Sequence, residues 1–203
     1  MKIVVFGAAG RTGRQIVKRA LGHGHAVTAF IHNTPLDLEH PGLTKVIGDA
    51  TDFDAVSSAM VGQTGVAFAL SGAGNHEPGI ANVVHAMAEH DVRRLAAVSA
   101  AGTFARNDRA LSIAYRAVIK TAMRAAYDDL EEMEMRIMAS DLDWTIVRPV
   151  GLTDDPATGS YRISLEGTLL PKATRISRED VAALVVKALE TDIYHRRAVV
   201  IAQ

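Results

Sequence analysis

The chain contains no cysteine, and aromatic residues make up only 5% of its 203 positions. The absence of cysteine excludes a disulfide framework, a thiolate metal site and a cysteine nucleophile. Strong net charge is missing too: 22 basic side chains face 23 acidic ones, which gives no field for holding a nucleic-acid backbone or an anionic membrane. We therefore expect a small-molecule substrate, no nucleic-acid or membrane partner, and a monomer or weak homo-oligomer.

Long hydrophobic runs are also missing. No segment approaches the roughly eighteen consecutive apolar residues of a membrane-spanning helix, and the apolar stretch at the N-terminus ends at Gly7, too early for a signal peptide. The sequence also lacks a fixed-period repeat and a linker rich in glycine, serine or proline. We expect a cytoplasmic protein whose residues 1–203 form one domain.

Short apolar runs alternate with segments of helical periodicity along most of the chain. The runs are nearly continuous in apolar residues, which is typical of strands buried on both faces. We expect strands at Lys2–Phe6, Ala26–Ile31, Thr44–Ile47, Gly65–Leu70, Arg94–Ser99, Asp143–Val147 and Ala198–Ile201. We expect helices over Arg11–Leu21, over Pro78–His90, within Ala110–Ala139 and after the capping residue Ser177. This alternation predicts an α/β fold: a Rossmann-like, doubly wound parallel sheet in three α/β/α layers.

The regular alternation stops after Pro149. Turn-forming residues come first, and a short alternating strand follows around Ile163. We interpret about residues 150–175 as a small insertion on the substrate side of the sheet.

Three glycines follow the first expected strand in a G-x-x-G-x-x-G run, Gly7-Ala8-Ala9-Gly10-Arg11-Thr12-Gly13. Glycines at a strand-to-helix junction let bare backbone N–H groups at the helix N-terminus face a pyrophosphate. The last glycine lets the helix lie close to the strand. The pattern predicts a dinucleotide site, and the alternative is a tight turn that binds nothing.

The end of the second expected strand bears on the choice between NADP and NAD. NAD-binding units of this kind place an acidic residue there to bond the ribose 2′-hydroxyl. This chain has His32 instead, and His32 together with Arg11 would supply donors to a 2′-phosphate. NADP is therefore favoured as the cofactor, and NAD remains possible. The alternative interpretation is that His32 is a surface histidine that contacts no phosphate.

Further motifs follow the later strands: Gly48-Asp49-Ala50, Leu70-Ser71-Gly72-Ala73-Gly74, Val98-Ser99-Ala100-Ala101 and Trp144-Thr145-Ile146-Val147-Arg148-Pro149. With the glycine loop, they resemble the atypical short-chain dehydrogenases/reductases, and within these the group of biliverdin-IXβ reductase (flavin reductase) and its NmrA-like relatives. The resemblance covers nearly the whole chain. It includes the closing segments Thr158-Gly159-Ser160-Tyr161, Leu165-Glu166-Gly167 and Arg175-Ile176-Ser177-Arg178-Glu179-Asp180.

The resemblance implies a set of cofactor-binding residues. The pyrophosphate would lie on the glycine loop, at Gly7, Ala9, Gly10, Arg11, Thr12 and Gly13. His32 would meet the 2′-phosphate, Asp49 and Ala50 the adenine, Leu70, Ser71 and Gly72 the path to the nicotinamide ribose, and Ser99, Ala100, Pro149 and Val150 the nicotinamide. The chain departs from the group at His32, which replaces an arginine, at Ala100, which replaces a hydroxyl, and at Val150, which replaces a histidine.

The catalytic Tyr-x-x-x-Lys pair of ordinary short-chain dehydrogenases is missing from the sequence. Tyr115 has Ile119 at the required spacing, and Tyr127 has Glu131. Hydride delivery to a ketone needs a positioned acid, whereas delivery to a flavin, a quinone or a tetrapyrrole leaves a delocalised anion that water can protonate. The sequence therefore favours a planar conjugated acceptor, with flavin as a possible substrate rather than a bound cofactor.

Ser99 is the one candidate for a polar catalytic helper, and it would equally serve to orient the nicotinamide amide. Two other functions remain open. One is an NmrA-like sensor that binds the dinucleotide without turnover. The other is an isomerase or epimerase of the extended short-chain class, which is disfavoured because little chain follows Pro149.

The remaining polar residues are interpreted without a catalytic role. His23 and His25 alternate across a turn and His85 and His90 are five residues apart, so neither pair is expected to present two ligands together, and no metal site is predicted. The acidic stretch Asp128, Asp129, Glu131, Glu132 and Glu134 is interpreted as a solvated helix face. Asn75 and His76 are interpreted as loop residues near the expected cleft, with contact to the substrate as the alternative.

Overall fold

The computed structural model describes residues 1–72, 74–104, 118 and 121–203. The strands are β1 (Lys2–Phe6), β2 (Ala26–Ile31), β3 (Leu43–Ile47), β4 (Gly65–Phe68), β5 (Arg94–Val98), β6 (Asp143–Pro149), β7 (Gly151–Thr153), β8 (Arg162–Ser164), β9 (Arg175–Ser177) and β10 (Arg197–Ala202). The helices are α1 (Arg11–Gly22), α2 (Phe53–Met60), α3 (His76–Glu89), α5 (Arg124–Ala139) and α6 (Arg178–Glu190). Tyr115, Ile119 and much of the helix expected within Ala110–Ala139 lie outside the described residues.

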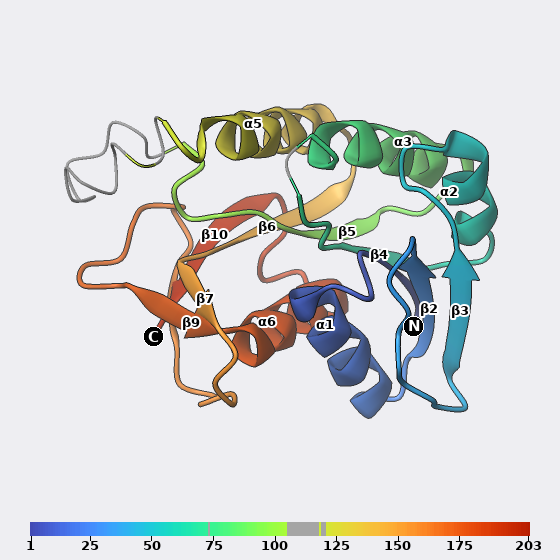
Figure 1. Cartoon of the computed structure of the whole chain (residues 1–203), viewed down its shortest axis with the longest axis horizontal. Helices are drawn as coiled ribbons and strands as arrows, with labels where there is room; N and C mark the ends of the chain where they lie inside the picture. The colour runs from blue at the N-terminus through green and yellow to red at the C-terminus, as the bar shows by residue number, and fades with distance from the viewer. Residues whose placement is uncertain (73, 105–117, 119–120) are drawn as a thin grey trace.

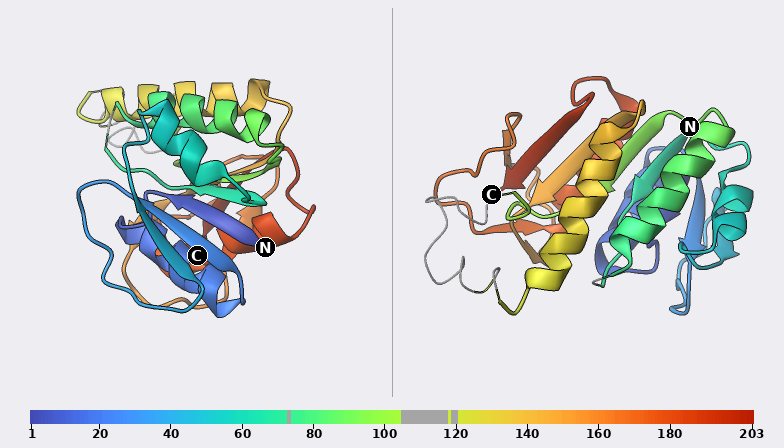
Figure 2. Two further views of the ribbon diagram at one scale, coloured as in Figure 1. Left: turned by 90° about the vertical axis from the view of Figure 1, so that its right-hand side faces the viewer. Right: turned by 90° about the horizontal axis from the view of Figure 1, so that it is seen from above.

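Eight strands form one sheet in the order β3-β2-β1-β4-β5-β6-β10-β8. Neighbouring strands are parallel except that β8 is antiparallel to β10. Helices α2, α3 and α5 cover one face of the sheet, and α1 and α6 cover the other (Figures 1 and 2). The structure thus confirms the predicted Rossmann-like, doubly wound sheet in three layers. Among the described residues, no helix is both long and apolar enough to cross a bilayer.

The two cores explain why the strands are almost continuous in apolar residues. Along β1, Ile3 and Val5 point into the core under α1 and α6, while Val4 and Phe6 point into the core under α2, α3 and α5. Successive side chains of a strand point to opposite faces, so a strand covered on both sides needs apolar residues at every position.

Helix α2 was not predicted from periodicity. It is eight residues long, which is too short for a clear helical pattern. It begins after Asp52, whose carboxylate accepts hydrogen bonds from the amides of Asp54 and Ala55. This N-cap, rather than an apolar stripe, marks the helix in the sequence.

The segment after β6 departs from the regular alternation of strands and helices. Strands β7 and β9 pair in a small separate sheet, while β8 extends the edge of the main sheet. Asp180, buried in the first turn of α6, holds the loop between β7 and β8. Its carboxylate accepts bonds from the Thr158 and Gly159 amides, at 3.1 and 3.0 Å, and from the Ser177 hydroxyl at 2.8 Å.

We expect Asp180→Asn to lower the free energy of unfolding by about 1–3 kcal/mol at pH 7, because buried amide donors lose a charged acceptor. Burial alone would raise the pKa of Asp180, but the bonds from Thr158, Ser177 and Gly159 outweigh it and hold the pKa below its usual value. The stabilisation is therefore present above the ordinary carboxyl pKa and is lost as the pH falls through the lower folded pKa.

Urea unfolding of both proteins, at pH 7 and again at a pH below the ordinary carboxyl pKa, measures this effect. The difference in stability between native protein and variant should shrink at the acid pH. An equal difference at the two pH values would show that the ionised carboxylate does not provide the stabilisation.

Candidate active site

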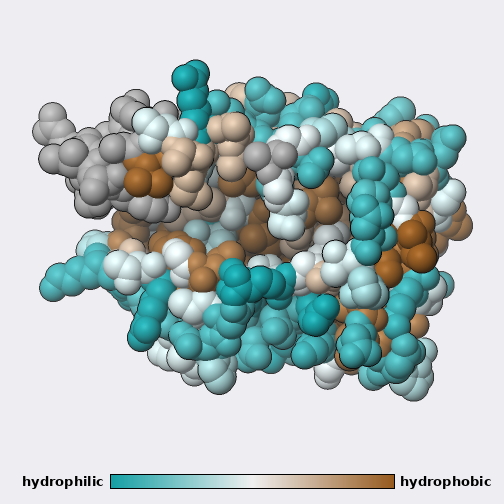
Figure 3. Space-filling model, viewed as in Figure 1, coloured by the Kyte–Doolittle hydropathy of each residue, from teal (hydrophilic) through white to brown (hydrophobic). Residues whose placement is uncertain are grey.

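Three neighbouring cavities run along the carboxyl ends of the parallel strands. Their volumes are about 410, 260 and 670 Å³. The first and second share Gly10, Leu70 and Ser71 as lining residues. The second and third share Ser99, Leu152 and Arg178. The three cavities therefore adjoin one another in a row, which we call the trough. Figure 3 shows apolar side chains gathered between the α5 layer and the segment of β7 and β9.

The trough brings together most of the residues predicted to hold the cofactor. The first cavity is lined by Gly7, Ala9, Gly10, His32, Asp49, Ala50, Leu70 and Ser71 among others. The second adds Arg11, Thr12 and Ser99, and the third adds Ala100, Pro149 and Val150. Two predicted residues do not line these cavities. Gly13 packs behind the loop against Gly7, and Gly72 adopts a φ of +98° beside Asn75.

The glycine loop leaves the N-terminus of α1 open toward the second cavity. Gly10 is the N-cap residue, no side chain caps the helix, and no acidic residue lies in its first turn. In contrast, Ser177 caps α6 and Asp52 caps α2. The first N–H groups of a helix lack intrahelical partners and carry partial positive charge, so an anion fits here. This geometry fits a dinucleotide pyrophosphate better than a turn that binds nothing.

Gly7 must be glycine for the loop to take this course. Its φ is +77°, in the left-handed region, and a Cβ there would lie 2.7 Å from the carbonyl carbon of Ala69. The chain can therefore turn from β1 into α1 directly beside the end of β4.

The adenosine end of the trough contains a carboxylate beside the predicted phosphate ligand. His32 Nε2 lies 3.7 Å from Asp49 Oδ2, and both side chains are about half exposed. Asp49 Oδ1 accepts bonds of 2.8 Å from the amide and the hydroxyl of Thr51. The Thr51 amide, followed by its hydroxyl, lowers the pKa of Asp49, so the carboxylate is ionised near His32 at neutral pH.

Arg11 forms an ion pair with Asp154, in the loop that follows β7. Asp154 also accepts a bond of 2.7 Å from Arg178. The Asp154 carboxylate therefore pairs with two arginines that line the second cavity. A diphosphate bound on the glycine loop would compete with Asp154 for Arg11, because both are anions that attract the same guanidinium.

Ser99 follows β5 and lies over a buried ion pair. Its hydroxyl donates a bond of 2.5 Å to Glu134, whose side chain is fully buried. Glu134 also accepts bonds from Nε and Nη2 of Arg148. Since the Ser99 proton points to Glu134, the Ser99 oxygen can act toward the cavity only as a hydrogen-bond acceptor. This geometry favours an orienting role for Ser99 over a role as an acid.

The interpretation of the acidic stretch on α5 as a solvated face is wrong for two of its members. Glu134 is buried with Arg148, and Asp129 is buried beneath the start of α3. Asp129 accepts bonds from the amides of Gly74, His76 and Glu77. Burial alone would raise the pKa of Asp129, but these bonds and the His76 ring outweigh it and lower the pKa. Asp129 therefore acts as a distant N-cap of α3.

The interpretation of His76 as a loop residue is also wrong. His76 is the first residue of α3, and its ring is buried, with Nδ1 2.6 Å from Asp129 and Nε2 3.2 Å from the carbonyl oxygen of Leu70. These contacts attach α3 to the loop that follows β4. Asn75, which precedes the helix, lines the first cavity.

The third cavity has an apolar wall and two basic groups. Its apolar lining includes Val150, Leu152, Leu169, Leu170 and Pro171, and its basic residues are Lys172 and Arg178. Buried Tyr127, on α5, also lines it. The sequence analysis did not assign Tyr127, Lys172 or Arg178 to the site. The sequence does contain one signal for Arg178, which directly follows the N-cap residue Ser177 and so begins a helix. In a parallel α/β fold, such helix N-termini lie at the edge of the sheet where ligands bind.

Comparisons with known proteins agree with this geometry. An uncharacterized chloroplastic protein of Arabidopsis thaliana is 29% identical over 215 residues, covering 93% of this chain and 71% of that protein. A wide-type short-chain dehydrogenase/reductase of Veillonella parvula, solved in complex with NADP, has a TM-score of 0.80 at 20% identity, with 100% and 94% of the chains covered. ChuY, an anaerobillin reductase of Escherichia coli O157:H7, has a TM-score of 0.79 at 22% identity, with 100% and 97% covered. At these identities the two structures share the fold. A family described as NAD(P)H-binding matches residues 7–192. This chain belongs to that NAD(P)H-binding family.

Proposed function

We propose that this protein is an NADPH-dependent reductase that transfers hydride to a planar conjugated acceptor such as a flavin, a quinone or a tetrapyrrole. The observation that carries the proposal is the trough, in which the cavity at the glycine loop shares Ser99 and Leu152 with a larger cavity that has an apolar wall. The names of two structural neighbours, one solved with NADP and one called a reductase, are consistent with it.

The residues of the trough divide into those that would bind the dinucleotide and those that would hold the acceptor. The amides of the glycine loop would bind the pyrophosphate, and Asp49 and Ala50 would border the adenine. Ser99, which can accept a hydrogen bond, would orient the nicotinamide amide. Bound NADPH would supply the hydride. The protein contributes mainly by aligning two rings and excluding water between them.

The apolar cavity also suits a reaction without a positioned acid. Reduction of a conjugated ring system leaves an anion spread over many atoms, which can take its proton from water. Lys172 and Arg178 place positive charge at the same cavity and would stabilise that anion electrostatically.

The test is a panel of acceptors, namely free flavin, a soluble quinone and a linear tetrapyrrole, assayed by the oxidation of NADPH. We expect turnover with at least one of them. Leu170 lines only the third of the three cavities. The larger side chain of a Leu170→Trp variant should therefore fill that cavity and impair turnover, while NADPH affinity stays unchanged. Tight NADPH binding with no turnover of any acceptor would instead favour the dinucleotide-sensing alternative.

We expect His32→Asp to reduce the preference for NADPH over NADH at least about tenfold, equivalent to about 1.4 kcal/mol. A second carboxylate beside Asp49 would repel a 2′-phosphate and would accept a bond from a free 2′-hydroxyl. Calorimetric titration with both dinucleotides measures the ratio.

His85→Asp serves as the matched control, because His85 is a similarly exposed histidine that does not line the first cavity. Its dinucleotide preference should match that of the native protein. A native preference for NADH, or unchanged discrimination in His32→Asp, would contradict the assignment of the phosphate.

A further inference from the structure

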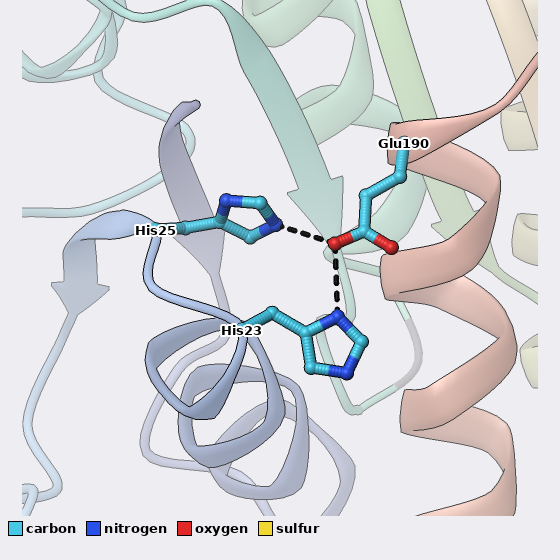
Figure 4. Close-up of side chains that lie close together, drawn as sticks. All are labelled: His23, His25 and Glu190. Atoms are coloured by element: carbon cyan, nitrogen blue, oxygen red, sulfur yellow. Dashed lines mark hydrogen bonds and ion pairs between the residues drawn. The ribbon is translucent and has the colours of Figure 1, made fainter.

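Two histidines and a glutamate converge at the edge of the molecule opposite the trough. His23 Nδ1 lies 2.9 Å from Glu190 Oε1, and His25 Nε2 lies 2.8 Å from the same oxygen (Figure 4). The three ligand atoms all lie within 4.8 Å of one another. The expectation that His23 and His25 do not present their ligands together is therefore wrong.

The turn between the two histidines explains the convergence. His23 is the C-cap of α1, and Gly24 adopts a φ of +78° that reverses the chain. The amide of His25 then bonds back to the carbonyl oxygen of Ala20, so His25 is held against the last turn of the same helix. Alternation along the sequence separates side chains only in an extended strand, and this segment is not extended.

The donor set suits a divalent transition metal. Imidazole nitrogen and carboxylate oxygen are common zinc ligands, with bonds of about 2.0–2.2 Å, so tetrahedral ligand atoms lie roughly 3.3 Å apart. The observed separations, from 2.8 Å to at most 4.8 Å, require only small shifts to reach that value. Hard cations such as Mg²⁺ prefer all-oxygen sites and suit this set poorly.

Two helix C-termini attract a positive ion to this point, while the N-terminal ammonium of Met1, 3.2 Å from His25 Nδ1, partly opposes it. Glu190 is the last residue of α6 and His23 follows α1, so two helix C-termini, each with partial negative charge, meet here. The side chains of His23 and Glu190 are 35% and 28% exposed, which leaves room for water as a fourth ligand.

We propose that His23, His25 and Glu190 form a binding site for a divalent transition metal of the zinc class, which ties the C-terminal ends of α1 and α6 together. The site lies where β2 begins, while the trough lies where the strands end. A metal here would therefore stabilise the fold without taking part in hydride transfer.

The test uses the full chain after treatment with a chelator. Calorimetric titration with Zn²⁺ should show one ion bound per chain, and the melting temperature should rise with Zn²⁺ and fall back with chelator. Co²⁺ should give the visible absorption of a tetrahedral site. Excess Mg²⁺ should not displace either ion.

Two variants locate the ion. Glu190→Gln and His25→Gln should each weaken Zn²⁺ binding at least about tenfold and remove the thermal response, since each deletes a ligand. His85→Gln is the matched control, because His85 has a carboxylate neighbour, Glu89, at 3.5 Å but belongs to no three-ligand cluster among the described residues. It should bind Zn²⁺ like the native protein, and NADPH affinity should be the same in all of them.

Three results would overturn the proposal. The first is the absence of stoichiometric Zn²⁺ binding to the native chain. The second is unchanged affinity in both ligand variants, and the third is an equal loss of affinity in His85→Gln. None of these results bears on the proposed reductase activity, which is measured separately.

Discussion

Replacing Arg148 with leucine is expected to lower the free energy of unfolding by about 3–5 kcal/mol, because the change leaves a buried carboxylate without its counter-ion. Glu134 is fully buried and the Arg148 side chain is 10% exposed. The guanidinium binds both carboxylate oxygens and also lies 5.1 Å from the centre of the Phe104 ring. A loss of this size is a large part of the about 5–15 kcal/mol that stabilises a typical domain.

Urea unfolding of the single and double variants measures the effect. Glu134→Leu alone should also be costly, since it leaves a buried guanidinium. The double variant, Arg148→Leu with Glu134→Leu, should recover much of the loss because neither charge remains buried. Ser99 would lose its acceptor in the double variant, but the Thr103 hydroxyl lies 3.1 Å away and can replace it. Strictly additive losses in the double variant would contradict a paired arrangement.

The buried pair also shows what the sequence could not predict. Glu134 belongs to an acidic stretch, and such stretches usually face solvent. Its burial depends on α5 lying across β6, which places Arg148 against it from another element. Asp129 is buried for a similar reason, since its partners belong to the start of α3. No local pattern records these contacts, because they join segments that are far apart in sequence.

Most of the fold could be predicted, because the relevant signals are local. The apolar runs and helical stripes identified β1, β2 and α1 closely, and their alternation was enough for a parallel sheet. Helix α2 was missed because it is short, and β8 departs from the parallel pattern because it returns along the edge of the sheet after a turn.

In the candidate site, too, the features set by local sequence patterns could be predicted, and those set by contacts between distant segments could not. Residues directly after strand ends could be predicted to meet, because parallel strands bring their carboxyl ends to one edge. Lys172 and Leu170 could not, since they belong to the irregular segment before β9. The neighbouring loop after β7 is fixed by non-local hydrogen bonds that its amides donate to Asp180. The sequence therefore predicted many of the residues around the first two cavities, but only part of the lining of the third.

Gly13→Ala is expected to weaken NADPH binding about 100-fold, because α1 and the glycine loop touch at this residue. A Cβ on Gly13 would overlap the carbonyl oxygen of Gly7 and lie 2.7 Å from its carbonyl carbon. Both are backbone atoms that no rotamer change can move, so the loop and the helix must separate. An amide bond to a charged phosphate is worth about 1.5–3 kcal/mol, and losing one or two gives an effect of this size.

Gly22→Ala is the matched control, because it makes the same change in the last turn of the same helix. A Cβ on Gly22 meets no atom within 4 Å, so alanine should raise the free energy of unfolding by about 0.5–1 kcal/mol and leave NADPH affinity unchanged. Calorimetric titration gives the affinities, and urea unfolding shows whether Gly13→Ala remains folded, with an expected cost of about 1–3 kcal/mol. If the folded Gly13→Ala protein bound NADPH as tightly as the native chain, the dinucleotide could not lie on this loop. The uncapped N-terminus of α1 would then have to bind an anion other than the dinucleotide pyrophosphate.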